Sequence, residues 1–212
     1  MRSARRQGAR PKVVFTKGAA GAYWCHVHRP DGAVVFVPSF DRTHRIPHDL
    51  AHVATERALW MTDGVFGSIM AGALFGDMRV VSGPRRHDER QRSDRIVRAN
   101  SASRALTVAE ALAGLVHKAV ETGDHDLLGK ARKQWGAVRQ DPFPYPAAAL
   151  ASARTLLEEL ANRWAALPVD GELEVSWAPR GRATRSARPA PAERAGRDRR
   201  GAAESGHRSA AR

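Results

Sequence analysis

The sequence has little cysteine and no long apolar segment. A single cysteine, Cys25, excludes an internal disulfide framework. The longest apolar stretch, residues 65–75, is interrupted by Gly67 and Gly72 and is shorter than the ~20 residues that a transmembrane helix needs. No apolar segment follows the basic residues 1–10, so we expect no signal peptide. These absences favour a protein without membrane spans, and a cytoplasmic location is the default expectation.

Positive charge is abundant but belongs to the two ends of the chain. The formal net charge is +13, yet residues 12–178 are nearly neutral. Residues 1–11 hold four arginines and no acid, and residues 179–212 hold ten arginines against three acids. We therefore predict a disordered basic N-terminus over 1–11, a single domain over 12–178 and a disordered Arg/Ala-rich tail over 179–212. The alternative for the ends is weak, salt-dependent contact with nucleic acid or with a protein partner that the sequence does not identify.

The order of β-prone and helical segments predicts an α+β fold. A small antiparallel sheet of about three N-terminal strands plus a C-terminal strand is expected to pack against a body of about five helices. The strands are expected over residues 12–16, 22–29, 33–37 and 172–177, and the helices over 47–60, 65–78, 107–123, 125–138 and 147–167, with a short helix over 94–100. Residues 80–103 are otherwise polar and rich in arginine. Thr107 and Glu110 match a capping box at the start of their helix.

The segment 48–56 is the candidate chemical centre. Pro47 suits the first turn of a helix, and Asp49 in that turn favours the helix dipole. His48 and His52 are four residues apart, so both rings project from one helix face within reach of a single ion. Zinc-binding helices use the same spacing. The pattern therefore predicts a divalent-metal site, with Zn²⁺ as the candidate ion and a hydrolase as the candidate activity.

Asp49 is the candidate catalytic residue of this segment. It stands where zincin proteases carry a glutamate that acts as general base. Its side chain is one methylene shorter, so a water held by His48 and His52 is harder for it to reach. This difference argues against a simple peptidase but not against metal binding.

Glu56 and His44 are the further candidate ligands. Glu56 lies about 12 Å from His48 along a straight helix, which suits it better to orient His52 than to bind the same ion. It can instead pair with His52 at a separate ion. Because Pro47 disfavours helical geometry at the residue before it, His44 is expected in a loop, from which it can supply a third ligand.

A structural interpretation of the same residues stays open. Nine histidines in the chain make a chance pair with this spacing plausible. In that case the histidines, Asp49 and Glu56 form a polar network without metal, in a non-enzymatic interaction module whose Arg-rich ends contact nucleic acid or a protein partner. The remaining candidate ligands outside the motif are Asp41, Asp63, His26 and His28.

The motif and the segment after it resemble a family of small uncharacterised actinobacterial proteins. Those proteins show a Leu/Ile-Pro-His-Asp-Leu-x-His-x-x-x-Glu segment, similar to residues 46–56 here, followed by a glycine-rich helix similar to residues 64–76. The resemblance covers roughly residues 12–120 and is densest over 40–80. It implies that the first two helices form one unit, and it carries over neither a metal nor a reaction.

Overall fold

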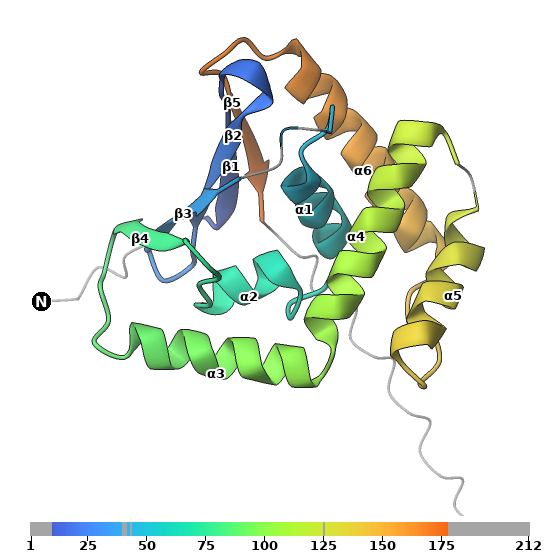
Figure 1. Ribbon diagram of the computed structural model, residues 1–212, viewed down its shortest axis with the longest axis horizontal. Helices are drawn as coiled ribbons and strands as arrows, with labels where there is room; N and C mark the ends of the chain where they lie inside the picture. The colour runs from blue at the N-terminus through green and yellow to red at the C-terminus, as the bar shows by residue number, and fades with distance from the viewer. Residues whose placement is uncertain (1–9, 40–41, 43, 125, 178–212) are drawn as a thin grey trace, which may run out of the picture. The chain divides into compact units, whose positions relative to one another are not determined.

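An antiparallel sheet of five strands joins the two ends of the folded region. The computed structural model describes residues 10–39, 42, 44–124 and 126–177. Strands β1 (Lys12–Lys17), β2 (Tyr23–His28) and β3 (Val34–Pro38) form a meander, and β4 (Arg79–Ser82) and β5 (Glu172–Ser176) complete the sheet. The strand order is β4-β3-β2-β1-β5 (Figure 1). The predicted meander with an added C-terminal strand is confirmed.

The sheet has one buried face, as its sequence pattern requires. In β2, Tyr23, Cys25 and Val27 are buried, whereas the alternating His26 and His28 are only half-buried on the other face. This alternation follows from the two-residue period of a strand. The histidines of β2 therefore point away from the core and from the helices packed on it.

The described part of the chain contains six helices, where about five were expected. They are α1 (His48–Ala58), α2 (Val65–Ala71), α3 (Glu89–Ala102), α4 (Ala105–Thr122), α5 (Leu127–Val138) and α6 (Ala147–Ala166), with one turn of 3-10 helix at Ala19–Gly21. α2 is shorter than predicted because Gly72 ends it in a left-handed conformation, with φ of +119°. α3 is longer than the short helix expected there. No helix within the described residues is long and apolar enough to cross a membrane.

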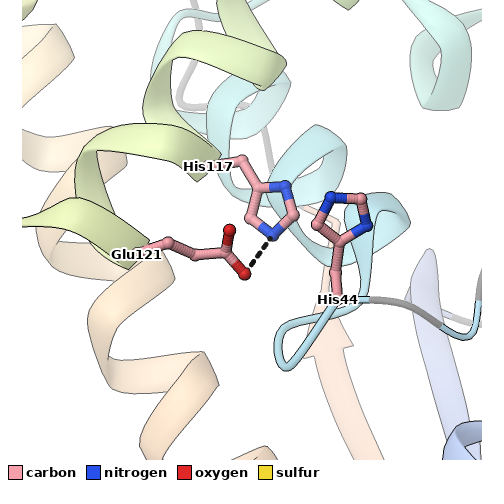
Figure 2. Close-up of side chains that lie close together, drawn as sticks. All are labelled: His44, His117 and Glu121. Carbon is pink, nitrogen blue, oxygen red and sulfur yellow. Dashed lines mark ion pairs between the residues drawn. The ribbon is translucent and has the colours of Figure 1, made fainter.

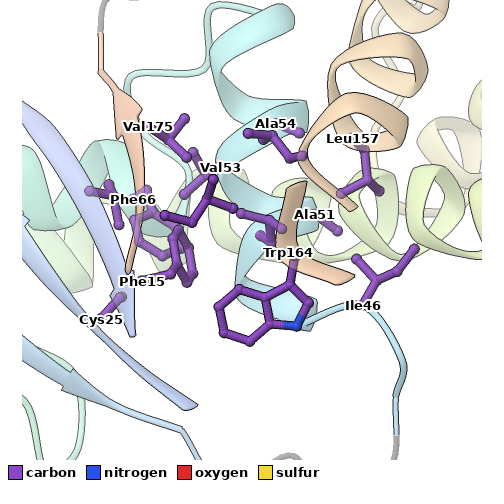
Figure 3. Packing of buried hydrophobic residues seen from close by; sticks show 14 of the residues in the cluster. Phe15, Cys25, Ile46, Ala51, Val53, Ala54, Phe66, Leu157, Trp164 and Val175 are labelled. Atoms are coloured by element: carbon purple, nitrogen blue, oxygen red, sulfur yellow. The ribbon is translucent and has the colours of Figure 1, made fainter. Parts of the chain in front are cut away.

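α1 is the central helix, because it lies between the sheet and the helices α4 and α6 (Figure 1). Every residue from Leu50 to Glu56 is buried. Val53 of α1, Phe15 of β1 and Leu157 of α6 have no exposed surface and meet in the main core (Figure 3). Burying each such side chain stabilises the fold by about 1.5–3 kcal/mol. A helix this enclosed has few positions left for polar side chains. Two of the buried ones on α1, His52 and Glu56, form hydrogen bonds with α4 and with the start of α2.

A second apolar cluster joins the far end of α1 to the other helices. It consists of Leu59, Met61, Val108, Ala109, Leu112, Ala131, Trp135, Ala149 and Leu150. Together the two cores fix the register between α1 and α4. Of the predicted disordered ends, all residues except Arg10 and Pro11 lie outside the described part of the chain.

Candidate metal centre

His48 and His52 of α1 converge on one carboxylate of α4. His48 Nε2 lies 3.0 Å from Glu110 Oε1. His52 Nε2 lies 2.9 Å from Glu110 Oε2. One ligand atom from each of the three residues lies within 4.8 Å of the other two, so the group could hold a metal ion. The packing of α1 against α4 creates this site, because neither helix alone contains the three ligands.

The other ring nitrogen of each histidine, Nδ1, forms a hydrogen bond with a residue outside this group of three. His52 Nδ1 lies 3.1 Å from Glu56 Oε1, which only accepts, so His52 Nδ1 carries a proton. His117 Nε2 lies 3.0 Å from the carbonyl oxygen of Ile46 and therefore donates to it. Burial lowers the pKa of His117, which favours the neutral ring, so its Nδ1 is an acceptor. His48 Nδ1, at 3.4 Å, donates to it.

This proton assignment leaves both Nε2 atoms facing Glu110 with a lone pair. A carboxylate oxygen also offers only lone pairs, so two acceptors would stand about 3 Å apart and repel. Two states relieve the repulsion. Either His48 and His52 take up a second proton on Nε2, or a cation lies between the nitrogens and the carboxylate.

The charges around His52 favour the protonated state when no metal is bound. Burial alone lowers the pKa of His52, but the carboxylates of Glu110 and Glu56 outweigh it and raise the pKa to about 10. The hydrogen bonds from His48 and His52 hold the pKa of Glu110 far below its usual range. A metal ion that binds here therefore displaces protons.

Glu56 connects the site to the start of α2. Its side chain has no exposed surface. Its Oε1 accepts hydrogen bonds from the backbone N–H groups of Val65 at 2.9 Å and Phe66 at 3.2 Å, and its Oε2 accepts one from Gly67 at 2.9 Å. With His52 Nδ1 as a fourth donor, the carboxylate accepts as many hydrogen bonds as its two oxygens can hold. Glu56 thus orients His52, which matches the supporting role that helix geometry indicated.

Asp49 faces the sheet. Its carboxylate hydrogen-bonds to the side chain of Tyr23 on β2. Burial is the main reason that the pKa of Asp49 is raised, and the nearby His52 and His48 act in the opposite direction. The structure therefore places Asp49 beside the histidines but engages it with Tyr23, and its catalytic role stays a prediction.

His44 lies with other partners than the motif predicted. The structure groups it with His117 and Glu121 of α4, and its ring is 5.0 Å from the ring of His117 (Figure 2). The ligand that joins His48 and His52 is Glu110 instead. Residues that the sequence left as further candidates do not join either group: His26 packs 5.6 Å from the ring of Phe36, Asp63 and His28 are outside both, and Asp41 is outside the described residues.

Glu110 is the candidate ligand beside His48 and His52 that the sequence analysis missed. The predicted capping box with Thr107 does not form, because α4 begins at Ala105, after Arg104 with φ of +59°. Thr107 therefore lies inside the first turn, and Glu110 is free to face α1. The useful signal was the spacing of Glu110, His117 and Glu121, which puts all three near one face of α4.

The comparisons with known proteins add no information on function to this geometry. No family model, no curated protein and no solved structure matches the chain. The resemblance to actinobacterial proteins stays a prediction. The structure itself shows two neighbouring His/Glu groups that could hold metal ions, without specifying the ion.

Proposed function

We propose that the chain binds a divalent metal ion, with zinc as the first candidate, through His48 Nε2, His52 Nε2 and Glu110. The observation that carries the proposal is the opposed arrangement of the two histidines: each Nδ1 is held by an outer partner while each Nε2 faces the same carboxylate. Two histidines and a glutamate are a ligand set of catalytic zinc sites. Ligands of tetrahedral zinc lie about 3.4 Å apart, so the two nitrogen–oxygen distances to Glu110 would need to widen by only a few tenths of an ångström.

The exposure of the ligands favours a reactive site over a structural one. The side chain of Glu110 is 62% exposed and that of His48 29%, whereas that of His52 is 3% exposed. Structural zinc sites are enclosed by four protein ligands, whereas catalytic sites keep a position for water. A metal-bound water is a nucleophile at neutral pH, and this supports hydrolysis as the class of reaction. Asp49 is the candidate base because it lies next to His48 in the motif, and burial raises its pKa.

A structural network is the second candidate, and one observation favours it. A doubly protonated His52 is fully satisfied between Glu56 and Glu110 without any ion. In that case the residues tie α1 to α2 and α4, and the chain serves as a non-enzymatic interaction module. Metal content separates the two functions.

The test is a metal analysis of purified protein combined with thermal unfolding. We expect wild type to retain zinc at this site and the double variant His48→Ala/His52→Ala to lose one equivalent relative to wild type. Zinc at about 100 times its dissociation constant stabilises a one-site protein by about 2.7 kcal/mol, which raises the melting temperature by about 5–10 °C. His26→Ala, a histidine on the outer face of the sheet, should behave as wild type. The proposal fails if wild type carries no stoichiometric metal and zinc leaves its melting temperature unchanged.

Hydrolysis is tested separately, on the zinc-loaded protein. Simple chromogenic carboxylic and phosphoric esters serve as probes of the reaction class. Activity that disappears in His52→Ala but persists in His26→Ala supports the hydrolase, and a metal-loaded protein inactive on both ester classes argues for a binding role only.

A further inference from the structure

A second group of candidate ligands lies beside the proposed centre, where His48 contacts His117. His117 and Glu121 are four residues apart on α4, and His44 reaches them from the segment before α1 (Figure 2). The His117 Nε2 atom lies 3.5 Å from Glu121 Oε1. One ligand atom from each of the three residues lies within 4.8 Å of the others. The set again consists of two imidazoles and a carboxylate.

The surroundings of this group resemble those of the first. His117 is buried, the side chain of Glu121 is 29% exposed, and His44 is exposed, so one side is open to water. The carbonyl oxygen of Ile46 lies 3.0 Å from the same His117 nitrogen that faces Glu121. A cation at that nitrogen would therefore find two oxygen atoms and one further imidazole in reach, a donor set suited to zinc.

We propose that His44, His117 and Glu121 form a second divalent-metal site, and that filling it opposes filling the first. The opposition rests on the proposed function and on the 3.4 Å contact between His48 Nδ1 and His117 Nδ1. Only one proton fits between these atoms.

The position of that proton decides which histidine has a free Nε2. When His48 binds a metal through Nε2, its proton is on Nδ1 and is donated to His117, whose own proton remains on Nε2 toward Ile46. When His117 binds through Nε2, its proton moves to Nδ1, and His48 must accept it and keep a proton on Nε2. Both sites fill together only if the contact between the two Nδ1 atoms is broken. The loss of one such hydrogen bond weakens the second ion on the order of tenfold.

The experiment is a zinc titration, by calorimetry with a competing chelator, of four forms of the full chain. Wild type is compared with His52→Ala, which removes a ligand of the first site only, and with Glu121→Gln, which removes a ligand of the second only. Glu159→Gln, the same change at an exposed position of α6, is the matched control. We expect two ions in wild type and in the control, and one in each site variant. The remaining ion of His52→Ala should bind about tenfold more tightly than the second ion of wild type.

The outcomes separate the two proposals. A single ion in wild type that is lost in His52→Ala and unaffected by Glu121→Gln overturns the second site and leaves the first. A single ion that is lost in Glu121→Gln and retained in His52→Ala overturns the first site alone. Two ions in wild type with equal affinity, and no gain in His52→Ala, overturn the opposition between the sites.

Discussion

Gly64, the residue before α2, is expected to be the most sensitive position for testing how the site is supported. A Cβ atom at Gly64 would lie 2.5 Å from Glu56 Cδ and 2.6 Å from Glu56 Oε2. Real Cβ atoms do not approach so closely, so Gly64→Ala must displace the Glu56 carboxylate. That carboxylate is enclosed and accepts three backbone hydrogen bonds, so it cannot move without losing some of them.

The magnitude follows from those hydrogen bonds. A hydrogen bond to a charged group contributes about 1.5–3 kcal/mol, and at least one must break. We therefore expect Gly64→Ala to lower the free energy of unfolding by about 3 kcal/mol. Because Glu56 also orients His52, zinc affinity should fall by about 10–100-fold, as it does when an outer partner of a metal ligand is lost.

The assay is urea unfolding followed by circular dichroism in the presence of a chelator, with zinc affinity measured separately. Gly136→Ala in α5 is the matched control, because nothing lies within 4 Å of the position where its Cβ would be. It should stabilise the protein by up to about 1 kcal/mol, since alanine is the better helix former. If the free energy of unfolding of Gly64→Ala lies within about 0.5 kcal/mol of the wild-type value, Glu56 is not held as the structure indicates, and the reasoning is refuted.

Three further predictions concern charge, ligation and packing. The folded pKa of His52, about 10, lies above its ordinary 6.5, so its contribution to stability is complete below about pH 6.5 and is lost as pH rises toward 10. The free energy of unfolding of chelator-treated protein, measured at pH 6, 8 and 10, should fall by on the order of 4 kcal/mol, a loss that His52→Gln lacks. Glu110→Gln should weaken zinc binding by more than the ~100-fold typical of residues that only hydrogen-bond to a metal ligand. It should change the free energy of unfolding of the metal-free protein by less than about 1 kcal/mol, because the Glu110 side chain is largely exposed. Equal zinc affinities of variant and wild type would exclude Glu110 as a ligand. Leu157→Ala should destabilise by about 2–5 kcal/mol, and Leu156→Ala, its half-buried neighbour, by clearly less; equal losses would contradict the core assignment.

The parts of the fold that local sequence determines were predictable, and the parts that packing determines were not. The meander follows from local sequence alone. Its β-prone segments are separated by Gly18 and Gly21 and by Pro30-Asp31-Gly32, residues that are typical of turns. β4 was missed because it is an edge strand with little buried surface, so its sequence has no apolar alternation. The end of α2 depends on the left-handed conformation of Gly72, and glycine occurs inside helices as well as after them.

The candidate site likewise has one part that local spacing predicts and one part that only packing creates. His48 and His52 were found because their spacing lies within one helix, and the same rule placed Glu56 in a supporting role. Glu110 is 58 residues from His52, and only the packing of α4 against α1 brings them together. Its local context, three residues after Thr107, was consistent with a helix cap, so sequence alone could not separate the two roles.

The pairing of β1 with β5 has a consequence for the protein during its synthesis. β1 is made before its partner β5, which follows more than 150 residues later, with Lys12 opposite Ser176. At a synthesis rate of about 5–20 residues per second, the outer edge of β1 stays unpaired for on the order of ten seconds or more. An unpaired edge is a template for pairing with other chains. Lys12 and Lys17 place positive charge at the two ends of β1, and lysines on an edge strand disfavour such pairing.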